Sequence, residues 1–76
     1  MANFAQSILC GIDVSKDTLD IATADQITTQ IPNTPEGISQ WLASLPKGSK
    51  IALESTGRYH EAVLDLALGA GFDVYI

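Results

Sequence analysis

The amino-acid sequence predicts an α/β fold with one mixed sheet and elements in the order βββαβαβ. Two observations point to it. Residues 7–31 contain three short stretches rich in apolar and β-branched residues, separated by turns of a few residues, which is typical of an antiparallel meander. From residue 33 onward the apolar spacing becomes helical, and each helical segment is followed by a short apolar stretch. That alternation favours parallel strands joined by helices.

The first three elements are predicted as strands over residues 7–14, 19–24 and 27–31. Both alternating faces of the first strand are largely apolar, which is typical of a central strand. The connections at residues 15–18 and 25–26 are short, so these strands are expected to pair antiparallel with their neighbours.

Residues 33–45 carry apolar side chains at i, i+3, i+4 and i+7 spacing, which predicts an amphipathic helix. These side chains are Ile38, Trp41, Leu42 and Leu45. Asn33 or Thr34 is expected to be the N-cap, with Pro35 in the first turn, where a missing N–H is tolerated. Pro46 is expected to end the helix.

A buried strand over residues 50–54, a second helix over residues 59–69 and a last strand over residues 72–76 complete the order. The second helix is expected to bury a stripe made of Tyr59, Ala62, Val63, Leu66 and Ala70. A meander followed by βαβ units is a ribonuclease-H-like arrangement, with helices packed on the faces of a mixed sheet. Residues 1–76 are predicted to be a single partial domain of this kind.

Composition narrows the classes of function. The chain has 76 residues and a net charge of −5, which argues against a basic surface that grips nucleic acid directly. The single cysteine, Cys10, allows no disulfide within the chain and fits the reducing cytoplasm, where a buried thiol would be inert. No apolar run approaches the ~20 residues of a membrane-spanning helix, so no membrane association is expected.

Two carboxylates are the strongest candidates for a site. Asp13 interrupts an apolar strand, and a buried carboxylate is costly unless it is paired or binds a metal. Glu54 ends the strand over residues 50–54. If that strand lies parallel beside residues 7–14, both acids reach the same edge of the sheet, where a divalent cation would offset their repulsion. The alternative is that Asp13 starts a turn and Glu54 is a polar strand end.

Three sequence segments together resemble a known family. The segments are "GIDVSKDTLDIA", "NTPEG" followed by "WL", and "ALESTGRYHEAVLDLALGAGFDVYI". They resemble the N-terminal domain of insertion-sequence-110 family transposases, which are DEDD-type, RuvC-like recombinases related to Piv-type DNA invertases. The resemblance covers nearly the whole chain. It rests on "GIDVSK" in combination with "ESTGRYH" about forty residues later, because neither piece is specific by itself.

The resemblance implies a ribonuclease-H-like fold in which Asp13 and Glu54 are the first two catalytic acids and ligands of Mg²⁺ or Mn²⁺. The activity it implies is DNA cleavage and rejoining by a cytoplasmic transposase that acts as a homo-oligomer, guided in some members by a structured RNA. The other two acids of the tetrad and a nucleophilic serine would lie outside this chain. This N-terminal fragment is therefore expected to be inactive alone.

Other polar residues near the acids have two interpretations each. Lys16 either neutralises Asp13 or contacts a phosphate, or it is a solvated turn residue. Thr56 caps the next helix, whose N-terminus favours anions, and Arg58 there either contacts a nucleic-acid phosphate or is simply exposed. Asp20 is expected to face solvent.

Two alternatives come from other classes of function. One is a fragment of an actin-like-fold sugar or acetate kinase, but "DVSKD" lacks the glycine between the acid and the hydroxyl residue. The other is a non-catalytic interaction or regulatory remnant that dimerises through the exposed sheet edge of the last strand. Mg²⁺ or Mn²⁺ binding that is lost in Asp13→Asn would separate the metal site from the interaction module, and ATP binding would identify the kinase.

Overall fold

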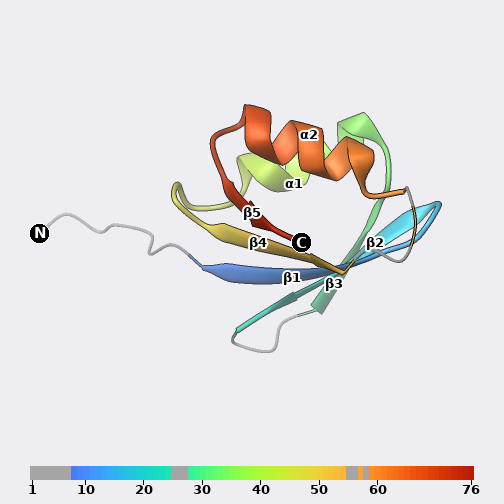
Figure 1. The fold of residues 1–76 in the computed structure, drawn as a ribbon, viewed down its shortest axis with the longest axis horizontal. Helices are drawn as coiled ribbons and strands as arrows, with labels where there is room; N and C mark the ends of the chain where they lie inside the picture. The colour runs from blue at the N-terminus through green and yellow to red at the C-terminus, as the bar shows by residue number, and fades with distance from the viewer. Residues whose placement is uncertain (1–7, 25–27, 55–56, 58) are drawn as a thin grey trace, which may run out of the picture.

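The computed structural model describes residues 8–24, 28–54, 57 and 59–76 (Figure 1). Within these residues the elements follow the predicted order βββαβαβ. They are β1 (Leu9–Val14), β2 (Thr18–Thr23), β3 (Thr28–Pro32), α1 (Pro35–Ala43), β4 (Lys50–Glu54), α2 (Glu61–Gly69) and β5 (Asp73–Tyr75).

The strands form one mixed sheet in the order β3-β2-β1-β4-β5. The pairs β1–β2 and β2–β3 are antiparallel, whereas β1–β4 and β4–β5 are parallel. The predicted α/β class, the meander and the parallel pairing of the first and fourth strands are all confirmed. β1 lies at the centre of the sheet because its two neighbours are the hairpin partner β2 and the crossover strand β4.

Both helices lie on the same face of the sheet (Figure 1). The sequence predicted helices on both faces of the sheet, and this prediction is wrong for the part of the chain that the structure describes. The strand order supplies the reason. The chain moves from β3 to β4 and then to β5 in one direction across the sheet, and right-handed crossovers then place both connecting helices on one side.

The core fills the space between the sheet and the two helices. Every second residue of the three central strands is buried there, and each helix adds two residues. The buried apolar side chains are Cys10, Ile12, Leu19, Ile21, Ile38, Leu42, Ile51, Leu53, Val63, Ala67 and Phe72. Burial of each large aliphatic side chain stabilises the fold by about 1.5–3 kcal/mol, so this layer supplies most of the stability.

Helix α1 begins where its sequence predicts and ends earlier. Thr34 is the N-cap, because its Oγ1 accepts a hydrogen bond from the Gly37 amide at 3.1 Å. The helix stops at Ala43 rather than near Pro46. The Ser44 hydroxyl donates to the Trp41 carbonyl at 2.6 Å, and such local hydrogen bonds compete with continuation of a helix.

Helix α2 begins two residues later than predicted, at Glu61, with His60 as the N-cap residue. Tyr59 therefore lies in the preceding turn, and its side chain is 46% exposed rather than packed into the core. The helix ends as expected at glycine: Gly71 has φ +90, and the Phe72 amide donates to the Ala67 carbonyl at 3.0 Å. The predicted strand over residues 72–76 is reduced to the three residues of β5.

Candidate functional site on the open face of the sheet

The face of the sheet turned away from α1 and α2, called here the open face, carries the candidate site. Side chains alternate between the two faces of a strand. In β1, Cys10 and Ile12 are buried beneath the helices, whereas Leu9, Gly11 and Asp13 are exposed on the open face. The predicted burial of Asp13 is therefore wrong, because no described element covers its side of the sheet.

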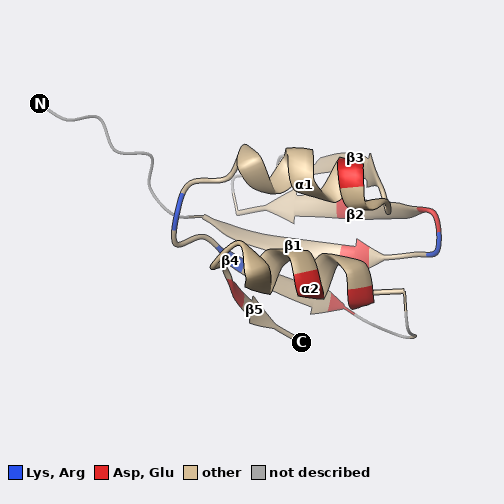
Figure 2. Cartoon of the chain, turned by 90° about the horizontal axis from the view of Figure 1, so that it is seen from above, with Lys and Arg blue, Asp and Glu red and all other residues tan. Residues whose placement is uncertain are grey.

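Three carboxylates stand side by side across the open face. Asp13 is the register partner of Asp20 in antiparallel β2 and of Glu54 in parallel β4. The predicted meeting of Asp13 and Glu54 at the carboxyl ends of two parallel strands is thus present (Figure 2). Directly opposed residues in neighbouring strands have Cβ atoms about 4.5–5.5 Å apart, so like charges here repel one another.

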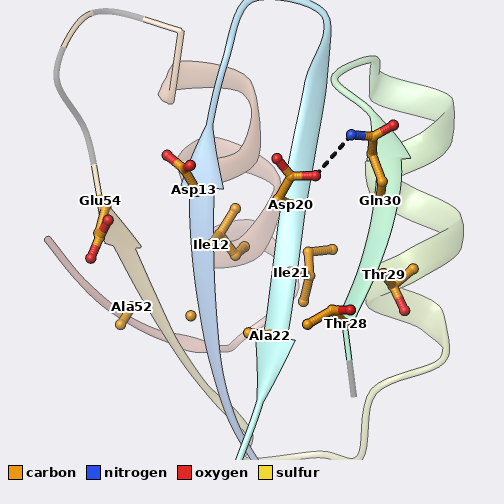
Figure 3. A pocket seen from close by; sticks show the side chains of 11 residues that line it. Ile12, Asp13, Asp20, Ile21, Ala22, Thr28, Thr29, Gln30, Ala52 and Glu54 are labelled. Atoms are coloured by element: carbon orange, nitrogen blue, oxygen red, sulfur yellow. Dashed lines mark hydrogen bonds between the residues drawn. The ribbon is translucent and has the colours of Figure 1, made fainter. Parts of the chain in front are cut away.

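Gln30 completes this line of side chains, called here the acidic row: Gln30, Asp20, Asp13 and Glu54. The Gln30 Nε2 atom donates to Asp20 Oδ1 at 2.8 Å (Figure 3). Asp20 is exposed, as predicted, and its position beside Asp13 was not predicted. The signal was present, because a hairpin closed at Val14 and Leu19 brings residue 20 opposite residue 13.

Next to the acidic row lies a second line, called here the small-residue row: Thr28, Ala22, Gly11 and Ala52. The two rows line a groove of about 530 Å³ (Figure 3). The groove is hollow because Gly11 has no side chain and the neighbouring strands contribute only methyl groups there. Its acidic end and its apolar floor are therefore parts of one surface.

The turn between β1 and β2 is closed by its own polar residues. Ser15 donates from its amide and its hydroxyl to the Thr18 carbonyl, at 3.0 and 2.8 Å. Lys16 lies exposed at the tip of this turn. No ion pair joins Lys16 to Asp13 among the described residues, and Lys16 does not line the groove. The neutralising role considered for Lys16 thus finds no contact in this structure.

Asn33, predicted only as a candidate helix cap, lies in the region of the site. Its Nδ2 atom donates to the Ser15 carbonyl at 2.9 Å and to the Tyr59 carbonyl at 3.0 Å. Its backbone amide donates to the Asp17 carbonyl at 2.9 Å. Asn33 therefore ties the turn that follows Asp13 to the loop that follows Glu54. These partners are 18 and 26 residues away in sequence, so no local pattern indicates them.

The loop between β4 and α2 holds two other predicted residues. Thr56 and Arg58 lie outside the described residues. At the end of that loop, His60 Nδ1 is hydrogen-bonded to the Gly57 carbonyl at 2.9 Å. The predicted phosphate contacts of Thr56 and Arg58 therefore stay predictions.

The donor set of Asp13 and Glu54 fits a hard divalent cation. Mg²⁺ is commonly held by one or two carboxylates, with water and substrate phosphate completing its octahedral shell. Among the described residues, no three or more His, Cys, Asp or Glu side chains are grouped so as to hold a metal ion. A cation at this site would therefore depend on the carboxylate pair together with ligands from outside the described residues.

Cys10 lies under the site, on the helix side of β1. It is buried, as predicted, and burial raises the pKa of its thiol because the charged thiolate loses its hydration. A raised pKa leaves little thiolate at neutral pH, which excludes Cys10 as an activated nucleophile.

Comparison with known proteins leaves the family open: no protein-family model matches the chain, and no curated protein matches it. Within the described residues, no helix has the length and apolar character needed to cross a membrane.

Proposed function

We propose that the chain is the N-terminal part of a ribonuclease-H-like, RuvC-like catalytic domain of a DNA transposase or recombinase. One observation carries the proposal: Asp13 and Glu54 are direct register partners at the carboxyl ends of two parallel strands. Ligands of open α/β sheets bind beyond the carboxyl ends of the strands. The resemblance of the sequence segments to insertion-sequence-110 family transposases supplies the reaction class.

The chemistry assigned to the chain follows from its charges. Asp13 and Glu54 would hold Mg²⁺ or Mn²⁺, which in such sites activates a nucleophile and stabilises charge on the phosphate undergoing transfer. The two carboxylates repel DNA phosphate when no cation is present, so DNA approaches this surface only with metal. The open face leaves both side chains accessible to a substrate.

Asp13 and Glu54 would be two of the four acids in the tetrad that this reaction class uses, and we propose that these two alone do not support catalysis. In the complete enzyme, the exposed turn at Lys16 and the loop containing Thr56 and Arg58 would contact phosphates of DNA. Assembly into a homo-oligomer, and pairing with a guide RNA, are parts of the same proposal.

Metal binding by the isolated chain tests the proposal directly. Mn²⁺ is titrated into the ¹⁵N-labelled protein, and paramagnetic broadening of amide signals is followed by NMR. We expect selective broadening at the ends of β1 and β4, and its loss in Asp13→Asn and in Glu54→Gln. Asp65→Asn is the matched control because it removes an exposed carboxylate from α2, remote from the open face. Equal broadening in all four proteins would contradict the metal site.

A second experiment tests the reaction class. In a protein that contains this chain together with the remainder of the catalytic domain, Asp13→Ala or Glu54→Ala is expected to abolish DNA strand cleavage. The thermal unfolding temperature should change little, because both side chains are exposed. Cleavage that survives both substitutions would exclude these acids as catalytic residues.

A non-catalytic interaction module is the second candidate, and one observation favours it. β5 is an edge strand of three residues, in which Tyr75 is 53% exposed, and Ile76 directly after it is 75% exposed. An exposed strand edge is a template for pairing with another chain. A concentration-dependent dimer in sedimentation that is lost in Val74→Pro, without any Mn²⁺ effect, would favour this candidate over the catalytic one.

A further inference from the structure

Among the described residues, Asp13 and Glu54 form the last register pair between β1 and β4. Beyond this pair the two segments part: β1 continues into the turn that leads to β2, and β4 continues into the loop that leads to α2. The last pair of a ladder opens more easily than a central pair, because neighbouring pairs support it on one side only. The relative placement of the two carboxylates therefore depends on what joins the segments after they part.

The side chain of Asn33 joins the two segments at this end of the ladder. Its Nδ2 atom donates to the Ser15 carbonyl at 2.9 Å, in the turn after β1. The same atom donates to the Tyr59 carbonyl at 3.0 Å, in the loop after β4. Each segment thus receives one hydrogen bond from a single amide group, and the two bonds together oppose separation of the segments.

The backbone of Asn33 is itself held in place. Its amide donates to the Asp17 carbonyl at 2.9 Å. Pro32 directly before it has a fixed φ, and α1 begins two residues after it. The first turn of α1 lies close to this junction, since a Cβ atom added to Gly37 would be only 2.9 Å from the Pro32 carbonyl oxygen. A side chain on so fixed a backbone can position the segments that it contacts.

The other polar atom of the Asn33 side chain indicates what this residue supplies. Its Oδ1 atom is buried without a hydrogen-bond partner among the described residues, which costs stability. Asparagine is the shortest side chain that offers two N–H donors without a charge, and its oxygen comes with them. Both donors are used, and each bonds to a different segment. The useful part of the side chain is therefore its pair of donors.

We propose that Asn33 is a positioning residue for Asp13 and Glu54: it keeps the end of the β1–β4 ladder closed and so holds the two carboxylates in fixed relative positions. Mg²⁺ demands a nearly ideal arrangement of its ligands, so its affinity depends on such placement. The inference rests on the proposed function for the role of the cation. Closure of the ladder requires no cation and is tested first in the metal-free protein.

Amide hydrogen exchange in the metal-free 76-residue chain tests the closure. In Asn33→Ala, exchange at the amides of Val14 and Glu54 should become about tenfold faster, because two hydrogen bonds that oppose local opening are lost. Thr34→Ala is the matched control, since it removes the neighbouring helix cap and lowers the overall stability while both donors of Asn33 remain. In that variant, exchange at the same two amides should stay within about twofold, because a local opening does not depend on the overall stability.

Mn²⁺ affinity tests the consequence for the two carboxylates. The NMR titration described above gives a dissociation constant for each variant that circular dichroism shows to be folded. Asn33→Ala should weaken binding about tenfold, as loss of a group that orients metal ligands commonly does, and Thr34→Ala should leave it unchanged. Asn33→Asp separates geometry from charge. Its added negative charge alone would strengthen cation binding, so weaker binding identifies the lost donors as the cause.

Several results would overturn the inference. Unchanged exchange at Val14 and Glu54 in Asn33→Ala would mean that the ladder closes without this residue. An equal increase in Asn33→Ala and Thr34→Ala would mean that Asn33 contributes only to overall stability. Undiminished Mn²⁺ affinity in Asn33→Ala, or higher affinity in Asn33→Asp, would also contradict it. If the unmodified protein binds no Mn²⁺, the proposed function fails, and the exchange measurement still decides whether Asn33 closes the ladder.

Discussion

The helix-covered face and the open face of the sheet are built from the same strands and carry opposite chemistry. Beneath the helices, β1, β2 and β4 bury apolar side chains, Ile12, Ile21 and Leu53 among them. On the other side, the same strands place three carboxylates and a row of small residues. One face removes apolar area from water, whereas the other sets like charges side by side.

Within one sheet, the helix-covered face therefore supplies stability, and the open face presents the side chains available for binding. A surface chosen only for stability would not align Asp20, Asp13 and Glu54 in register. Their exposure keeps the repulsion small, which allows the fold to tolerate them. Substitutions on the covered face should therefore change the free energy of unfolding strongly, and those on the open face should change mainly what the protein binds.

The largest effect is expected from a pair of leucines on opposite faces. Leu19 in β2 is fully buried, and Leu9 in β1 is half exposed. Leu19→Ala should lower the free energy of unfolding by about 2–5 kcal/mol, because it removes buried methyl groups and leaves a cavity. Leu9→Ala should lower it by less than about 1 kcal/mol. Urea unfolding followed by circular dichroism measures both, and similar losses in the two variants would mean that the open face is covered.

Asn33 joins the loop after β1 to the loop after β4. Its substitution should have an intermediate effect on the free energy of unfolding. Asn33→Ala removes the two hydrogen bonds to the Ser15 and Tyr59 carbonyls, each contributing roughly 0.5–1.5 kcal/mol to stability. Its buried Oδ1 atom has no hydrogen-bond partner among the described residues, so removing that atom offsets part of the lost stability.

Asn33→Asp sharpens this prediction. The added carboxylate oxygen would face two carbonyl oxygens with no proton to donate, and so aspartate should destabilise the protein more than alanine does. Thr34→Ala is the control, since it removes only the neighbouring helix cap and costs about 1 kcal/mol. If Asn33→Asp and Asn33→Ala both unfold in urea like the unmodified protein, the two hydrogen bonds do not hold the loops together.

Removal of a charge from the acidic row should raise the stability of the protein, in contrast to the substitutions above. Asp13→Asn removes the central charge of three neighbouring carboxylates, so the urea midpoint should rise, by at most about 1 kcal/mol of stability. The rise should be larger in 20 mM than in 500 mM sodium chloride, because salt screens exposed charges. Asp65→Asn, on α2, is the control. A fall in the midpoint for Asp13→Asn would mean that Asp13 has a stabilising partner.

Local sequence patterns predicted the secondary-structure elements of this fold. The placement of the helices and the exposure of Asp13 depend on how distant segments pack together. Alternation and helical spacing predicted the seven elements, and the short connections predicted which strands pair antiparallel. The placement of both helices on one face depends on the order of strands in the sheet, which no single segment encodes. The exposure of Asp13 follows from that placement, and so its burial was predicted wrongly.

The same division holds for the candidate site. Asp13 and Glu54 could be paired from sequence, because each ends a strand and the strands were expected to be parallel neighbours. Asp20 joins them through hairpin register, which follows from the length of the turn. The hydrogen bonds of Asn33 to Ser15 and Tyr59 join three loops and require the folded structure.

The smallest effect concerns Cys10, directly beneath the site on the covered face, and appears only at alkaline pH. Burial raises the pKa of the native thiol above the unfolded value of 9.0. Above that pH the unfolded chain loses the proton first, so it binds fewer protons than the native state and stability falls as pH rises. The contribution of Cys10 is thus fully present at pH 7 and is lost as the pH passes through the native pKa.

The free energy of unfolding of the unmodified protein and of Cys10→Ala is measured in urea at pH 7 and at pH 10.5. Between these two pH values, the unmodified protein should lose more stability than Cys10→Ala does. A difference that stays constant would mean that water reaches this thiol, and that the covered face is less dry than its apolar side chains indicate.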